Sequence, residues 1–82
     1  MHEAGLIAEM LRIALDTAHK GDIKKIERIN LGLGDMSHVT PESVFLYFEH
    51  FSKGTAAEGA ELTFAPIEGG SHDFQILSIE GD

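Results

Sequence analysis

The first three residues, Met1, His2 and Glu3, carry the most specific chemistry in this chain. A histidine in position two can offer a metal ion the α-amine of Met1, its own backbone amide nitrogen once that nitrogen loses its proton, and its imidazole. Such donors form fused chelate rings in one plane, which is typical of Ni(II) or Cu(II), and Glu3 can add a carboxylate oxygen. The alternative is that the terminus binds nothing, because terminal residues are usually frayed and so short a motif occurs close to chance frequency.

The chain contains five histidines, and those beyond His2 have ordinary explanations. His19 lies where a helix is expected to end, and a favourable interaction with the helix dipole explains it. His50 is expected to face solvent, and His72 falls in a linker-like run. His38 comes shortly before an expected helix, so it is either loop surface or a possible additional metal ligand.

Known enzyme signatures are incomplete in this sequence. His2 and Glu3 begin like the zinc-protease pattern H-E-x-x-H, but Leu6 occupies the position of the second histidine. Gly32 and Gly34 follow an apolar run but lack the last glycine of a dinucleotide-binding fingerprint. No serine or histidine has the context of an activated nucleophile. We therefore expect no catalytic residues, and a protein that is not an enzyme.

Composition limits the kinds of partner. The chain has 82 residues, enough for one small domain, and its fourteen acidic and six basic residues give a net charge of −8. That charge opposes binding to nucleic acid or to anionic membranes. The absence of cysteine rules out a disulfide and a thiolate zinc site within these residues. With no basic leader and no apolar run near the roughly 18 residues of a membrane span, we expect a cytoplasmic protein.

The clearest element is an amphipathic helix from Ala4 to Lys20, which we expect Gly21 to end as a left-handed cap. Its apolar stripe comprises Ile7, Met10, Leu11, Ala14 and Ala18. A second helix is expected from Pro41 to about Ser52, with Thr40 as its N-cap and Gly54 beyond its end. The core stripe predicted for it consists of Val44, Phe45, Phe48 and Phe51, with Leu46 or Tyr47 at the margin.

Three strands are expected. The first spans about 25–33 and alternates apolar with small or polar residues, but Ile26 is out of phase, which indicates a later start or a bulge near Glu27 and Arg28. The second spans 60–67, where Pro66 either ends the strand or confines it to an edge. The third spans 73–80, with apolar residues on both faces that leave its register open. The fold class predicted is α/β (α+β): a two-layer domain with two amphipathic helices packed on a three-stranded mixed sheet.

Taken together, several segments resemble the HypA family, which comprises nickel metallochaperones for the maturation of [NiFe] hydrogenase and, in some organisms, of urease. The likeness runs in order over about residues 1–67. The segments that carry it are Met1-His2-Glu3, Lys25-Ile26-Glu27-Arg28-Ile29, Gly32-Leu33-Gly34, Val39-Thr40-Pro41-Glu42-Ser43, and the run from Gly54 to Leu62.

The resemblance implies a nickel-binding α/β domain into which a zinc domain, built from two pairs of cysteines, is inserted before the last strand. This chain has none of those cysteines, so the zinc site of the family is absent from it. We expect residues 1–82 to form a single nickel-binding domain, with 68–72 as a short linker where the zinc domain would be inserted.

By the same resemblance, the cofactor is Ni(II), held by the Met1 amine and by the amide and imidazole of His2, with Glu3 in the site or close to it. In one branch of the family an aspartate contributes at the position of Thr40, so this chain lacks that carboxylate. The further ligand is left open between His38 and Glu3.

The partners implied are a HypB-type GTPase and the large subunit of [NiFe] hydrogenase. The alternative is a remnant that docks to those partners without metal. The short connection around residues 69–71 predicts either a tight hairpin or a last strand exchanged between two copies, which would make a domain-swapped homodimer.

Overall fold

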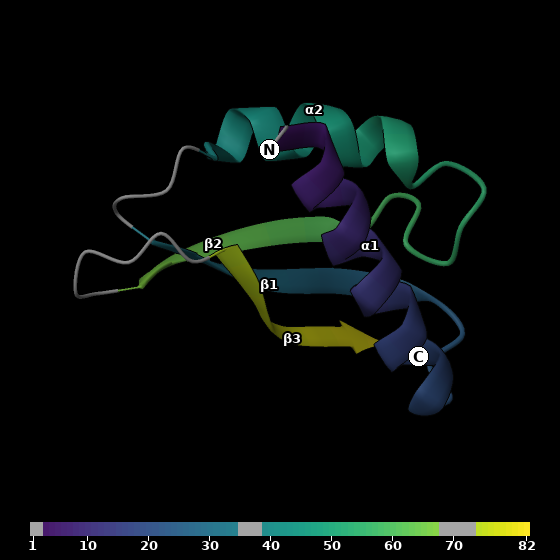
Figure 1. Ribbon diagram of the computed structural model, residues 1–82. Helices are drawn as coiled ribbons and strands as arrows, with labels where there is room; N and C mark the ends of the chain where they lie inside the picture. Colours follow the sequence, from purple (N-terminus) through teal and green to yellow (C-terminus); the bar gives the residue numbers. More distant parts are fainter. Residues whose placement is uncertain (1–2, 35–38, 68–73) are drawn as a thin grey trace.

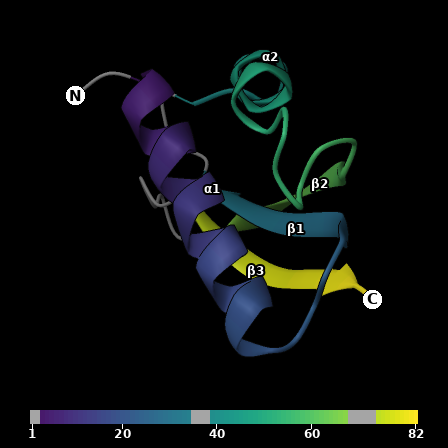
Figure 2. The same ribbon diagram turned by 90° about the vertical axis from the view of Figure 1, so that its right-hand side faces the viewer.

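The computed structural model describes residues 3–34, 39–67 and 74–82. Over these residues the chain forms two helices and three strands, in the order α1 (Glu3–Lys20), β1 (Ile26–Gly34), α2 (Pro41–Phe51), β2 (Glu61–Ile67) and β3 (Phe74–Gly81). Both helices lie on the same side of the sheet (Figures 1 and 2). The predicted two-layer α+β architecture is confirmed.

The sheet is mixed, with β1 in the centre and the order β2-β1-β3. Strand β1 pairs with β2 in parallel, with Ile29 opposite Leu62, and with β3 in antiparallel, with Ile29 opposite Ile79. Parallel strands need a crossover connection, and α2 supplies it between β1 and β2. Strand β2 occupies an edge, as Pro66 led us to expect.

Helix α1 covers the sheet with its apolar stripe and ends differently from the prediction. Ile7 and Ala14 are fully buried, as the periodicity requires. At the C-terminus the amide of Ile23 donates to the carbonyl of Ala18 (2.8 Å), and the amide of Asp22 donates to that of His19 (3.2 Å). This pair of bonds defines a Schellman cap, and the residue with positive φ is Asp22 (φ 60°), not Gly21.

Strand β1 begins at Ile26 and contains a bulge, which was one of the two explanations predicted for its irregular phase. The register with β3 shifts between Ile26 and Arg28, which leaves Glu27 as the extra residue of a bulge. The shift lets Ile26 and Ile29 both reach the core, where each is fully buried.

A second register shift explains the two-sided pattern of β3. Asn30 lies opposite Ser78 and Leu31 opposite Ile76, so Leu77 is the extra residue on β3. Phe74, Ile76 and Ile79 pack against the core. Leu77 is 51% exposed, and together with Ile67 it lies over Gly32 on the face of the sheet away from the helices.

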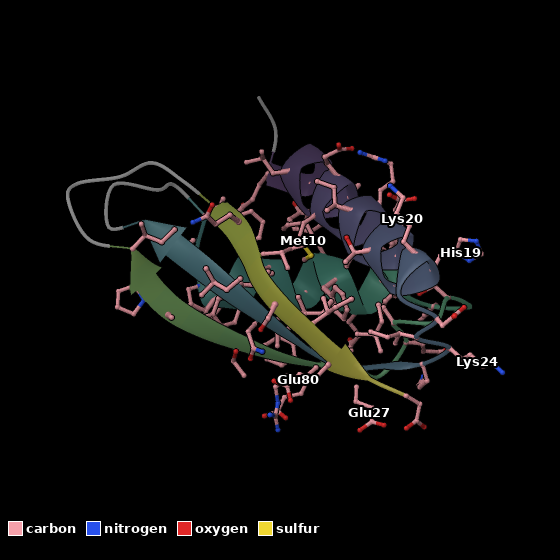
Figure 3. All side chains as sticks on the ribbon, turned by 90° about the horizontal axis from the view of Figure 1, so that it is seen from below. Met10, His19, Lys20, Lys24, Glu27 and Glu80 are labelled. Carbon is pink, nitrogen blue, oxygen red and sulfur yellow. The ribbon has the colours of Figure 1, made fainter. Side chains whose placement is uncertain are left out.

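The face of the sheet away from the helices is otherwise polar. Arg28 lies between two carboxylates, with its Nε 3.1 Å from Glu61 and a terminal nitrogen 3.2 Å from Glu80. Asn30 accepts a hydrogen bond from the hydroxyl of Thr63 (2.5 Å) and donates to Glu80 (2.8 Å). Glu80 and Glu27 extend from this side of the molecule, whereas Met10 lies between α1 and the rest of the core (Figure 3).

Candidate functional site

The N-terminal ends of the two helices are joined by a direct side-chain contact. Glu3, the first residue of α1, is half-buried, and its carboxylate accepts a hydrogen bond from the hydroxyl of Ser43 in the first turn of α2. The contact ties the first turn of α1 to the first turn of α2.

Ser43 also belongs to the cap of α2. The Thr40 hydroxyl accepts from the Ser43 amide, and the Ser43 hydroxyl accepts from the Thr40 amide, each at 3.2 Å. The two hydroxyl groups lie 3.0 Å apart. This reciprocal pattern is a capping box, with Pro41 at the first helical position, and it satisfies backbone donors that a helix otherwise leaves free.

The cap determines what these side chains offer a cation. Thr40 holds its hydroxyl against the backbone and has no carboxylate, so it does not replace an aspartate as a ligand. Glu3 accepts from Ser43 through one oxygen, and a carboxylate has a second oxygen available for another donor or a metal. Of the residues predicted for the site, the structure places Glu3 beside the cap of α2.

The remaining predicted ligands, Met1, His2 and His38, lie outside the described residues, as does the linker 68–72. Within the described part of the chain, no group of three His, Asp or Glu side chains gathers in a way that could hold a metal ion. His19 and His50 are both exposed, on different helices, as expected for surface histidines (Figure 3 for His19).

Two ion-pair clusters shift the pKa values of their own members. Neither cluster includes Glu3, Thr40 or Ser43. On the sheet, a hydrogen bond from Asn30 lowers the pKa of Glu80, helped by the charge of Arg28. The pKa of Arg28 is raised chiefly by its hydrogen bond with Glu61. On α1, the hydrogen bond with Arg12 lowers the pKa of Glu9. These exposed pairs are surface features rather than a reactive centre.

Ser43 is the member of this cluster that the sequence did not single out. The usual capping-box signature has Glu or Gln three residues after the cap, whereas here a serine takes that role. By itself the segment Thr40-Pro41-Glu42-Ser43 therefore predicts only the start of a helix. Its contact with Glu3 joins residues 40 positions apart, which no local pattern predicts.

A solved structure shares this architecture. The chain superposes on the solution structure of the Ni metallochaperone HypA from Helicobacter pylori with a TM-score of 0.81, covering 98% of this chain and 97% of that one. The sequence identity is 18%, so this likeness defines the fold alone.

Sequence relatives define the family. The family model described as "Hydrogenase/urease nickel incorporation, metallochaperone, hypA" matches residues 1–72. The hydrogenase maturation factor HypA of Moorella thermoacetica is 40% identical over 62 residues, covering 76% of this chain and 55% of the relative. That of Caldanaerobacter subterraneus is 33% identical over 64 residues, covering 78% and 56%.

The chain belongs to the HypA family, and it spans just over half the length of these curated relatives. In the part of the chain that the structure describes, there is no helix with the length and apolar character needed to cross a membrane.

Proposed function

We propose that this chain is a cytoplasmic nickel-delivery domain for the maturation of [NiFe] hydrogenase. It binds one Ni(II) through the Met1 amine and through the amide and imidazole of His2, and passes the ion to a partner. The observation that carries the proposal is the family match over residues 1–72, which includes a histidine at position two. The coordination chemistry supports it, because these three nitrogens form the planar site that Ni(II) accepts.

The contact between Glu3 and Ser43 supports a role for Glu3 in this site, because it holds the Glu3 carboxylate beside the cap of α2. The fourth position of the planar site then belongs either to the second oxygen of Glu3 or to His38. Thr40 is not a candidate, since its hydroxyl is part of the cap.

The partners we propose are a HypB-type GTPase and the hydrogenase large subunit. We further propose that residues 1–82 act as one nickel-binding domain, with 68–72 at the place of the family's zinc domain. Within one chain β3 pairs with β1. Exchange of β3 between two copies, which would give a domain-swapped homodimer, is the alternative that a short connection allows. Light scattering at two concentrations tests this dimer.

The experiment for the metal site is a nickel titration of four proteins, each produced without a tag. They are the native chain starting at Met1, His2→Ala, a version with residues added before Met1, and His50→Ala as the control for an exposed histidine. We expect planar Ni(II) absorption in the native chain and in His50→Ala only. Equal binding by the extended or His2→Ala protein would show that the terminal site is wrong.

A second candidate function is docking to the same partners without metal transfer. It is favoured by large apolar side chains exposed on α2, of which Leu46 and Phe45 are the most exposed. In that case His2→Ala keeps its full affinity for a HypB-type partner, as measured by pull-down and calorimetry. Loss of docking on His2→Ala, with the fold intact, contradicts the metal-independent role.

A further inference from the structure

Helix α2 exposes an apolar surface on the side turned away from the core. Val44 and Phe48 are buried, and Phe51 is half-buried, as its amphipathic pattern predicts. Phe45, predicted to be a core residue, is instead 52% exposed, and its neighbour Leu46 is 71% exposed. That part of the prediction is wrong, because the layer under α2 does not extend far enough to cover Phe45.

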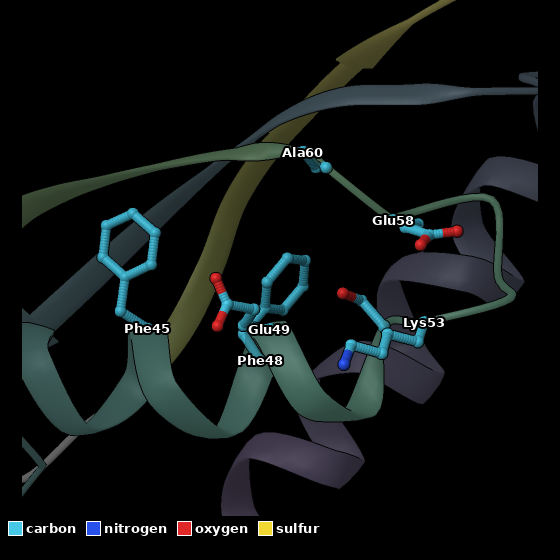
Figure 4. A pocket seen from close by; sticks show the side chains of 8 residues that line it. Phe45, Phe48, Glu49, Lys53, Glu58 and Ala60 are labelled. Carbon is cyan, nitrogen blue, oxygen red and sulfur yellow. The ribbon is translucent and has the colours of Figure 1, made fainter.

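Phe45 lines two neighbouring hollows of the surface. One, of about 300 Å³, lies between α2 and the chain leading into β2, and its lining includes Phe48, Lys53 and Ala60. Figure 4 shows Phe45 and Phe48 rising from α2 on one side of this hollow, with Ala60 and Glu58 across from them. The other, of about 320 Å³, is lined by Glu42, Phe45, Leu46 and Glu49.

The residues around the second hollow form one stripe on the helix, which we name the α2 outer face: Glu42, Phe45, Leu46 and Glu49. Their spacing, i, i+3, i+4 and i+7, places them on one side of an α-helix. Two apolar side chains therefore lie between two exposed carboxylates. At 1.5 Å per residue, the carboxylates are separated by about 10.5 Å along the helix axis, or about two turns.

We propose that the α2 outer face docks an amphipathic, basic helix of a partner protein. Such a helix packs its apolar residues on Phe45 and Leu46 and places Lys or Arg, two turns apart, against Glu42 and Glu49. This surface uses neither Glu3 nor Ser43, so the proposal holds whether or not the terminus binds nickel.

The carboxylates of the α2 outer face favour a basic helix over other occupants. A second copy of the chain would bring its own Glu42 and Glu49 against the same carboxylates, and like charges that meet across an interface oppose binding. Nucleic acid and anionic membranes are disfavoured by the same carboxylates and by the net charge of −8. A basic partner gains both apolar contact and opposite charge.

The test measures binding of the 82-residue chain to two synthetic peptides of identical composition. One is an 18-residue helix with a leucine stripe flanked by lysines, and the other is the same peptide with its sequence scrambled. Fluorescence anisotropy gives the dissociation constants, and NMR shifts locate the contact. We expect the amphipathic peptide to bind about tenfold more tightly than the scrambled one, with the largest shifts at Phe45 and Leu46.

Two charge-matched variants separate docking from general attraction to an acidic protein. Leu46→Glu places a charge on the α2 outer face, and Leu77→Glu places the same charge on an exposed residue of the sheet. General electrostatic attraction would strengthen binding of the basic peptide to both variants. Docking predicts about tenfold weaker binding for Leu46→Glu and no weakening for Leu77→Glu, while circular dichroism reports whether each variant is folded.

Three results would overturn the proposal. The first is equal affinity for the two peptides. The second is an equal effect of Leu46→Glu and Leu77→Glu on binding. The third is a concentration-dependent dimer of the native chain that Leu46→Glu dissolves, which would show that the occupant is a second copy.

Discussion

The hydroxyl of Ser43 donates a hydrogen bond to the carboxylate of Glu3, 40 residues earlier in the chain, and so joins the first turn of α2 to the first turn of α1. The same hydroxyl accepts from the Thr40 amide. One side chain thus completes the cap of α2 and anchors the first turn of α1. A helix cap and the approach to the candidate metal terminus are physically linked.

Replacing Ser43 with Ala is expected to lower the free energy of unfolding by about 1–3 kcal/mol, because it removes a capping contact and a hydrogen bond to a carboxylate. Urea unfolding measures the loss. Glu42→Gln, one residue away and exposed, serves as a control for a change in the first turn of α2.

A double-mutant cycle with Glu3→Gln isolates the contact between the helices. If the Ser43 hydroxyl acts through Glu3, the sum of the losses of unfolding free energy in the two single variants exceeds the loss in the double variant. Strictly additive losses would show that Ser43 serves only the cap and that the two residues are not coupled.

Local signals in the sequence were sufficient to predict the helices and the strands. Thr40-Pro41 marks the start of α2, and the out-of-phase Ile26 marks the bulge in β1. Contacts between distant segments were not predictable in this way. The serine in the capping box has no local mark of its bond to Glu3, and the bulge at Leu77 exists only relative to the register of β1.

At the C-terminus of α1, the residue with positive φ is not the one that the sequence predicted. Gly21 looks like the left-handed residue, but Asp22 has the positive φ of 60°. We expect Asp22→Gly to raise the free energy of unfolding by about 0.5–1 kcal/mol, because glycine adopts this conformation without the steric cost of a β-carbon. Thermal or urea unfolding provides the measurement.

Gly21→Ala is the matched comparison for that prediction. A β-carbon at Gly21 would meet the carbonyl oxygen of Thr17 at 3.5 Å, an ordinary contact, and the residue has no positive φ. Alanine should therefore be neutral or stabilising there. A loss of more than about 1 kcal/mol in Gly21→Ala would instead support Gly21 as the left-handed residue.

The periodicity of α2 shows a related limit of sequence reasoning. Apolar spacing determines which residues share a side of a helix, but not whether another layer covers that side. Val44 and Phe48 are buried in the core, whereas Phe45 is 52% exposed. The breadth of the covering layer depends on where β2 runs, which the pattern of α2 does not contain.

Gly32 is predicted to tolerate no larger side chain. A β-carbon there would lie 3.0 Å from two atoms of Ile67 and 3.1 Å from Leu77. Gly32→Val should therefore cost about 1–3 kcal/mol of stability through overpacking, as measured by urea unfolding. Gly5→Ala, on α1 with nothing within 4 Å of its β-carbon, should instead stabilise by up to about 1 kcal/mol.

The proposed planar site predicts the outcome of metal competition. Cu(II) exceeds Ni(II) in intrinsic affinity for nitrogen donors, so added Cu(II) should displace bound Ni(II) from the native chain. Zn(II) should displace it poorly, because zinc prefers tetrahedral sites. Absorption spectroscopy follows both exchanges. Efficient displacement by Zn(II) would indicate a site without planar geometry.

Glu80 is expected to contribute to the loss of stability in acid. Its pKa in the folded chain lies below the ordinary value of a glutamate, mainly because Asn30 donates a hydrogen bond to it and also because Arg28 is near. The contribution of Glu80 to stability is therefore fully present above its pKa in the unfolded chain, and it is lost as the pH falls through its lower pKa in the folded chain.

Glu80→Gln should flatten the dependence of unfolding free energy on pH below about 4.5. Glu27→Gln, which removes an exposed carboxylate at the neighbouring bulge, is the control. An identical acid profile for Glu80→Gln and the native chain would show that the hydrogen bond from Asn30 does not persist in solution.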